Sequence, residues 1–223
     1  LIIRKEAIKM QQITNTIFDL EEQIAKEKMI FESIHNQTLS IAEELLLEIN
    51  NNRSNLYFTD ENGKEIKDEE GNQLQVEVDF WTEDEYSKIE MQLKSIKAEL
   101  ESQKESPELA KEELELFQEQ LSNLKDQQEK LVLLACEKGL LSMDRDDIAN
   151  DILEAFEKQG FLLKSEWDKT EETSIFYEGN SEKNTKDDQR ESIAINILND
   201  VGTELTIRVV PNGRKNIIHF HRN

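Results

Sequence analysis

Apolar residues recur at alternating spacings of three and four along the first fifty residues, a pattern that predicts one long helix from about Ile2 to Asn50. Such spacing is typical of coiled coils, in which a narrow face of one helix contacts another helix. The residues of the pattern are Met10, Ile13, Ile17, Leu20, Ile24, Phe31, Ile34, Ile41 and Leu45, with Glu27 and Thr38 as polar interruptions. Four of them, which we call the N-terminal seam, are the candidate oligomer contacts: Ile13, Ile17, Leu20 and Ile24.

Residues 54–81 show a different pattern, in which short apolar runs alternate with turn sequences. The turns are Asp60-Glu61-Asn62-Gly63 and Asp68-Glu69-Glu70-Gly71-Asn72, rich in residues that favour tight reversals. The segment is therefore predicted to be a small β-meander inserted between helices. In its last strand Leu74, Val76 and Val78 alternate with polar residues, so we expect these three side chains on one face.

Two further helices are predicted after the meander, and together they form an antiparallel hairpin. Thr82-Glu83-Asp84-Glu85 matches a capping box and opens the first helix, whereas Ser106-Pro107-Glu108 opens the second, which is expected to stop at Gly139. Their apolar faces contain Tyr86, Ile89, Leu93, Ile96 and Leu100 in the first, and Ala110, Leu114, Phe117, Leu121, Leu124, Leu131 and Ala135 in the second.

The predicted helices differ in length. At about 1.5 Å per residue, the first helix spans about 75 Å, whereas the two hairpin helices span about 33 Å and about 46 Å. Part of the first helix therefore extends beyond the hairpin. We expect this overhang to pack against a second copy of the chain or against a partner protein.

The C-terminal part predicts a short helix that begins at Asp144 and ends at Gly160, followed by an antiparallel sheet. Strands are expected at 161–167, 173–178, 191–198, 203–210 and 215–222. One sheet face should be buried beneath the helix, since apolar residues alternate at Ile193, Ile195, Ile197, Leu205, Ile207 and Val209. On the last strand we expect Ile218 and Phe220 to point inward and His219 and His221 outward.

These elements predict an α+β protein with two parts. Residues 1–139 form a long antiparallel coiled-coil or helical-bundle region with the β-meander at 54–81. Residues 140–223 form a small domain of one helix and an antiparallel sheet of four or five strands. The helical pattern already present at Leu1 suggests that the chain is part of a longer protein.

The net charge of −22 narrows the choice of partners. So acidic a chain argues against binding to nucleic acid or to anionic membranes, because both depend on basic residues. The longest apolar runs fall far short of the roughly 20 residues that cross a bilayer, so no membrane segment is predicted. Cys136 is the only cysteine, which excludes an intrachain disulfide and favours a reducing, cytoplasmic setting.

Basic residues gather near the C-terminus, where no acidic residue follows Leu205. This candidate site for an anion or a partner consists of Arg208, Arg214, Lys215, His219, His221 and Arg222. Ion pairs with the acidic helices of the same chain are the alternative use of these charges.

Two groups of residues are candidates for metal binding. His219 and His221 share one face of a strand, but no further ligand is identifiable by spacing. Asp144, Asp146, Asp147 and Asp151 crowd the predicted start of a helix, where capping accounts for the first and third. No cofactor signature is present, and we expect neither a cofactor nor an enzymatic site.

Three functions follow from these patterns. The first is a non-enzymatic coiled-coil scaffold or protein-interaction module that binds a partner or a second copy through its helical faces. The second is an acidic inhibitor that mimics nucleic acid and occupies a basic cleft on another protein. The third is a metal-dependent hydrolase built on the aspartates or on the histidine pair.

Overall fold

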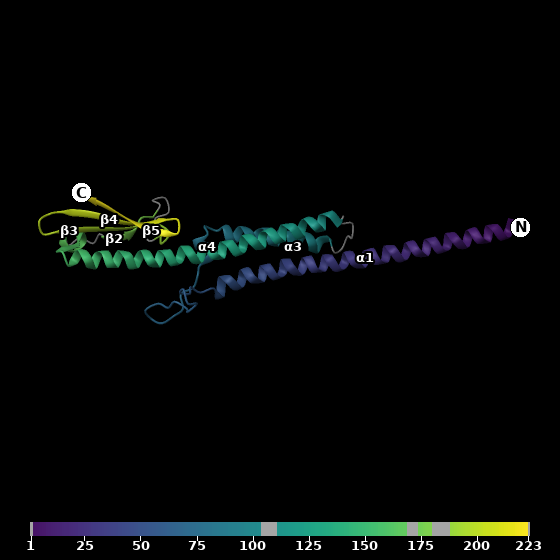
Figure 1. Cartoon of the computed structure of the whole chain (residues 1–223), viewed down its shortest axis with the longest axis horizontal. Helices are drawn as coiled ribbons and strands as arrows, with labels where there is room; N and C mark the ends of the chain where they lie inside the picture. The colour runs from purple at the N-terminus through teal and green to yellow at the C-terminus, as the bar shows by residue number, and fades with distance from the viewer. Residues whose placement is uncertain (1, 104–110, 169–173, 180–187, 223) are drawn as a thin grey trace. The chain divides into compact units, whose positions relative to one another are not determined.

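A computed structural model describes residues 2–103, 111–168, 174–179 and 188–222 (Figure 1). The chain forms two compact units: unit 1 contains Leu1–Asn51 and Ser87–Gln128, and unit 2 contains Asn52–Tyr86 and Glu129–Asn223. Long helices and a C-terminal antiparallel sheet confirm the predicted α+β class. The predicted boundary between residues 139 and 140 falls inside a helix.

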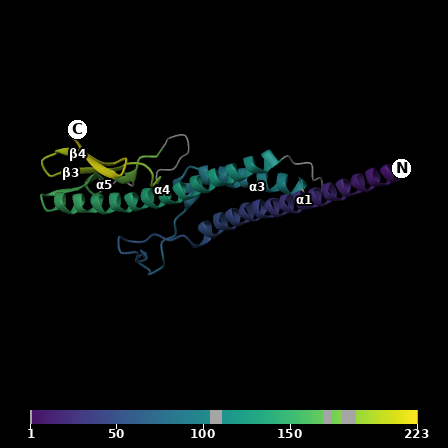
Figure 2. The same ribbon diagram turned by 45° about the vertical axis from the view of Figure 1, so that its right-hand side comes forward.

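Unit 1 is a bundle of helical segments from α1 (Ile2–Asn55), α3 (Glu85–Gln103) and α4 (Lys111–Glu157). The single long N-terminal helix is thus confirmed, and it extends five residues beyond the predicted end at Asn50. Figures 1 and 2 both show α3 and the first part of α4 side by side, with the later part of α1 along them. The predicted start of the hairpin's second helix, Ser106-Pro107-Glu108, lies outside the described residues.

Polar contacts fix the directions of the helices in unit 1. His35 Nε2 lies 2.9 Å from the carbonyl oxygen of Leu100, and Glu43 pairs with Lys97 at 3.2 Å, so α1 and α3 run antiparallel. Gln118 of α4 donates to the hydroxyl of Thr38 at 3.1 Å. His35 is buried between these helices.

The core of unit 1 comes from one apolar face of each helix. Every apolar residue predicted for α3 is buried, because a repeat of three and four keeps these side chains on one face. The buried apolar residues of this unit are Leu39, Ala42, Leu45, Ile49, Ile89, Leu93, Ile96, Leu100, Leu114, Phe117, Leu121 and Leu124.

Unit 2 begins with three short extended segments that close on one another. The amide of Phe58 donates to the carbonyl of Leu74, that of Leu74 to Ile66, and that of Ile66 to Phe58, at 2.9–3.0 Å. These three residues are eight apart, because each intervening turn repeats an aspartate followed three residues later by glycine. Gly63 and Gly71 have φ of 76° and 87°, a conformation that favours glycine.

This arrangement corrects three details of the predicted meander. Its segments meet through isolated bridges rather than continuous ladders, and α1 occupies residue 54. Val78 starts the short helix α2 (Val78–Trp81), so it does not continue the last strand. The capping box is also wrong, because the Thr82 hydroxyl donates to the Val78 carbonyl and α3 begins only at Glu85.

Gly139 does not end a helix, contrary to expectation, because α4 continues through it to Glu157. A Cβ atom at this position would lie 2.3 Å from Cζ of Phe58 and 3.3 Å from Cε2 of Trp81. The glycine therefore permits the close approach of two aromatic rings to the helix. The separate short helix predicted from Asp144 to Gly160 is the last part of α4.

The sheet contains β1 (Phe161–Leu163), β2 (Ile175–Tyr177), β3 (Ile193–Asn199), β4 (Glu204–Asn212) and β5 (Lys215–Arg222). All pairings are antiparallel in the order β1-β3-β4-β5, with β2 also paired to β3. The predicted first strand is shorter than expected, since α5 (Lys164–Asp168) replaces its second half.

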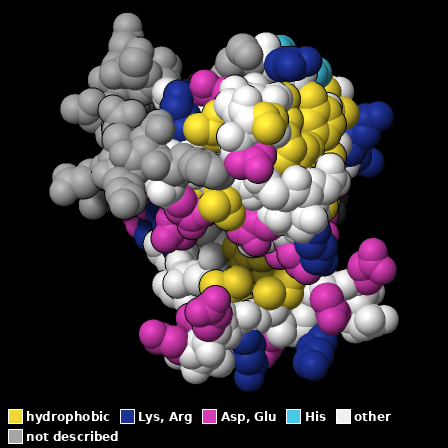
Figure 3. All heavy atoms as spheres, turned by 90° about the vertical axis from the view of Figure 1, so that its left-hand side faces the viewer, with side chains coloured by type: hydrophobic (Ala, Val, Ile, Leu, Met, Phe, Trp, Pro, Cys, Tyr) yellow, Lys and Arg dark blue, Asp and Glu magenta, His cyan; other side chains and the backbone are white. Residues whose placement is uncertain are grey.

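The apolar face of the sheet packs against the end of α4, as predicted (Figure 2). Ile193, Ile195, Ile197, Ile207 and Val209 are buried there beside Ala149 of the helix. Ile218 and Phe220 lie opposite Val209 and Ile207 in the register, but on edge strand β5 they remain 42% and 58% exposed. Figure 3 shows exposed hydrophobic side chains beside histidine and basic side chains on one face of the molecule.

Candidate interaction site

The N-terminal seam lies on the part of α1 that extends past the hairpin of unit 1 (Figure 1). Its side chains are exposed by 59% at Ile13, 51% at Ile17, 52% at Leu20 and 64% at Ile24. Large aliphatic side chains each gain about 1.5–3 kcal/mol when they leave water completely. The seam therefore presents four such residues in a row that the described part of the chain does not cover.

The buried face of α1 is not a straight continuation of this seam. In the bundle, buried positions follow a run of three and four through His35, Thr38, Ala42, Leu45 and Ile49. Ile34 and Ile41, which the predicted pattern included, are only half-buried. Thr38 and Leu45 belong to both patterns, but the buried His35 and Ala42 each lie one residue, or about 100° of helical rotation, beyond Ile34 and Ile41. The contact face therefore turns by about half of that angle. The narrow seam fits contact with one helix, whereas the bundled part of α1 contacts both α3 and α4.

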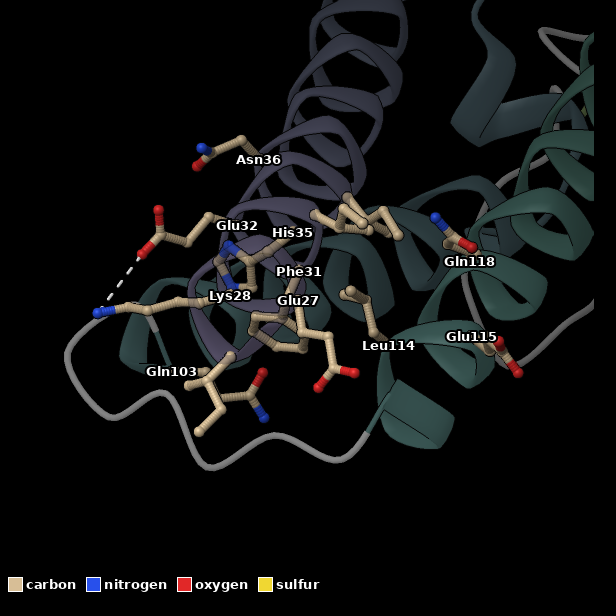
Figure 4. A pocket seen from close by; sticks show the side chains of 13 residues that line it. Glu27, Lys28, Phe31, Glu32, His35, Asn36, Gln103, Leu114, Glu115 and Gln118 are labelled. Carbon is tan, nitrogen blue, oxygen red and sulfur yellow. Dashed lines mark ion pairs between the residues drawn. The ribbon is translucent and has the colours of Figure 1, made fainter. Parts of the chain in front are cut away.

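A groove of about 1140 Å³ adjoins the seam within unit 1 (Figure 4). Ile24, the last seam residue, lines it together with Phe31 of α1 and Leu114 of α4. In Figure 4 Leu114 and Gln118 of α4 lie on one side of the groove, whereas Glu32 and Asn36 of α1 point away from them. The exposed apolar surface of the seam thus leads into a partly apolar groove at the end of the bundle core.

The predicted basic residues lie on the paired strands β4 and β5 and in the turn between these strands. Arg208 and His219 are cross-strand neighbours, and Arg208 pairs with Glu178 at 2.7 Å. Arg214 lies in the β4–β5 turn and approaches Glu137 at 3.6 Å. The remaining members are exposed along β5, with Lys215 opposite Asn212, His221 opposite Thr206 and Arg222 opposite Leu205. Two of the basic residues therefore pair with acids of the same chain.

No protein-family model matches this chain, and no curated protein or solved structure was found to be similar to it.

Of the four aspartates that the sequence grouped as candidate metal ligands, two have other contacts. Asp144 accepts a hydrogen bond from Asn216 at 2.8 Å, and Asp146 accepts one from the Tyr177 hydroxyl at 2.5 Å. All of them lie within α4, away from any helix start. Among the residues that the structure describes, no three histidine, cysteine or acidic side chains are placed to hold a metal ion.

Arg145 is a buried residue that the sequence patterns did not single out. Its Nη1 donates to Asn216 at 3.1 Å and its Nη2 to the Gln189 carbonyl at 2.7 Å, while burial lowers the pKa of the guanidinium. It lines a second cavity, of about 880 Å³, within unit 2. We interpret Arg145 as a structural residue that fastens β5 and the turn at residues 188–190 to α4.

Cys136 is half-buried, and this burial raises the pKa of its thiol. A raised pKa keeps the sulfur protonated near neutral pH, whereas a nucleophile or metal ligand needs the thiolate. Within the described ranges, no helix combines the length and hydropathy required to cross a bilayer.

Proposed function

We propose that this chain is a non-enzymatic protein-interaction module that assembles with another helix through the N-terminal seam. The observation that carries the proposal is the exposure of all four seam residues, each by more than half of its surface. Burying them against an apolar helix face would supply most of the driving force, since apolar burial dominates stable protein association.

The shape of the site supports the same proposal. A narrow line of apolar residues at spacings of three and four matches the contact face of a two-helix coiled coil, with aliphatic side chains interleaved between the helices. The adjoining groove, lined by Phe31 and Leu114, offers room for the end of a bound helix. We place this assembly in a reducing, cytoplasmic setting, because the chain contains a single cysteine.

Site-specific photo-cross-linking in cells that make the natural protein tests this function. A photoreactive residue at Thr16 or Gln23, which flank the seam, should cross-link to a second polypeptide. The matched controls are Asn15 and Glu22, which are equally exposed but lie on the opposite side of the helix. Cross-links from the flanking positions alone support the proposal, and absence of cross-links, or equal yields from all four positions, contradicts it.

A further inference from the structure

The N-terminal seam is symmetric about a point between Phe18 and Asp19. Ile13 and Ile24 are equally distant from that point, as are Ile17 and Leu20. We infer that the partner of the seam is a second copy of the same helix, running antiparallel and centred there, an inference that rests on the proposed function. Ile13 then lies opposite Ile24 of the second copy and Ile17 opposite its Leu20, so every layer made by the seam is apolar.

The charges of the two halves of this segment favour the antiparallel direction. Residues 1–18 contain three basic residues and one acidic residue, a net charge of +2, whereas residues 19–36 contain five acidic and two basic residues, a net charge of −3. The antiparallel arrangement places each half against the half of opposite sign. A parallel pair places like charges together along its whole length, which opposes association.

Glu27 gives a second reason for this direction, because it occupies the next position of the seam after Ile24. In a parallel pair in register, two Glu27 carboxylates face each other across the contact. In the antiparallel pair Glu27 lies opposite Met10 of the second copy, beside its Lys9. The Glu27 carboxylate then lies next to a lysine instead of facing the Glu27 carboxylate of the second copy.

The register follows from the same positions. Sliding the second copy by one heptad moves the centre by half a heptad towards the N-terminus and places Ile24 opposite Glu6, which buries an aliphatic side chain against a carboxylate. In the proposed register, residues 3–10 of the second copy reach residues 27–34, the part of α1 that borders the groove. Because the pair has two-fold symmetry, the N-terminal end of each helix lies at the groove of the other copy.

Distances between spin labels test the arrangement in the full chain. Ile8, Asn15, Glu22 and Met29 are seven residues apart, so they lie on the same exposed side of α1 and outside the seam. Each is replaced singly by cysteine in a Cys136→Ser background and labelled, and dipolar spectroscopy measures the distance between the two copies. Circular dichroism confirms that each variant keeps the helix content of the parent.

The antiparallel pair predicts two matched distances. Labels at Asn15 and Glu22 should give equal short distances, with an axial offset of about 10 Å, and labels at Ile8 and Met29 equal longer ones, with an offset of about 31 Å. Four equal distances would show a parallel pair, and unequal values within either matched pair would show another register. Both results overturn the inference while leaving the proposed function intact.

Absence of coupling between copies at all four sites would also overturn the inference. The cross-linking experiment separates this outcome from failure of the proposed function. A cross-link from Thr16 or Gln23 to a different polypeptide would uphold the function of the seam and reject a second copy as its partner.

Discussion

The N-terminal seam of α1 and the surroundings of Gly139 in unit 2 are opposite extremes of packing. Ile13, Ile17, Leu20 and Ile24 are large side chains with more than half of their surface exposed. At Gly139, a single added carbon would lie 2.3 Å from Phe58. The contrast separates a contact that the chain completes by itself from a surface whose burial requires another molecule.

The same contrast exists within α1. Its residues from His35 to Ile49 form part of a closed core, whereas the seam belongs to the same helix and has similar aliphatic residues in solvent. Shortening a side chain between His35 and Ile49 should therefore lower the stability of the fold. Shortening a side chain of the seam should instead weaken association.

The largest effect is expected for Leu45→Ala, because Leu45 is only 4% exposed in the core of unit 1. Loss of its buried methyl groups should lower the free energy of unfolding by about 2–5 kcal/mol. Ile17→Ala, measured at concentrations too low for association, should change it by less than about 0.5 kcal/mol. Chemical denaturation followed by circular dichroism measures both. Equal losses would show that the seam is covered within the chain.

Gly139→Ala should destabilise unit 2 by about 1–3 kcal/mol, because the new methyl group must displace the Phe58 ring. The sign of this change in stability is informative, because alanine in place of glycine normally stabilises a helix interior by about 1 kcal/mol. Denaturation followed by tryptophan fluorescence reports the change, with Trp81 beside the site. The double variant Phe58→Leu/Gly139→Ala should recover part of the loss. A more stable single variant would refute the account of Gly139.

Gln128→Met should stabilise the protein by about 1–2 kcal/mol. The amide oxygen and nitrogen of Gln128 are buried and have no hydrogen-bond partner among the described residues, a costly arrangement that methionine avoids at similar size. Gln127→Met is the control, because Gln127 is exposed. Thermal and chemical unfolding measure both variants, and a destabilised Gln128→Met would reveal a hidden polar contact.

The smallest effect concerns Tyr177 at alkaline pH. Burial and its hydrogen bond to Asp146 raise the pKa of this phenol above the value of about 10 in an unfolded chain. Above pH 10 the unfolded tyrosine releases its proton while the folded one keeps it, so this stabilisation falls as pH rises. This loss amounts to about 1 kcal/mol by pH 11, and Tyr177→Phe should remove it because phenylalanine does not titrate. Unfolding measured from pH 8 to 11 tests this, with Tyr57→Phe as the control.

Much of the fold could be predicted because its signals are local. The residues of α3 that face the core repeat at helical spacing, and Ile193, Ile195 and Ile197 alternate as a strand with one buried face must. The overhang of α1 followed from comparing helix lengths. These inferences needed only the periodicity of neighbouring residues.

The errors arose where distant residues decide the local structure. Glycine usually marks a helix end, but the reason for Gly139 is a ring 81 positions earlier in the chain, at Phe58. His35 is buried because a carbonyl group of α3 meets it, and Arg145 because Asn216 and Gln189 do.

Sedimentation equilibrium of the full chain tests the central claim most directly. The wild type should form a reversible dimer, and Ile17→Lys/Leu20→Lys should remain monomeric at the same concentrations. Gln12→Lys/Asn15→Lys adds the same charge on exposed positions outside the seam and should dimerise as the wild type does. A wild type that stays monomeric at every concentration, or a seam variant that associates equally well, would contradict the account.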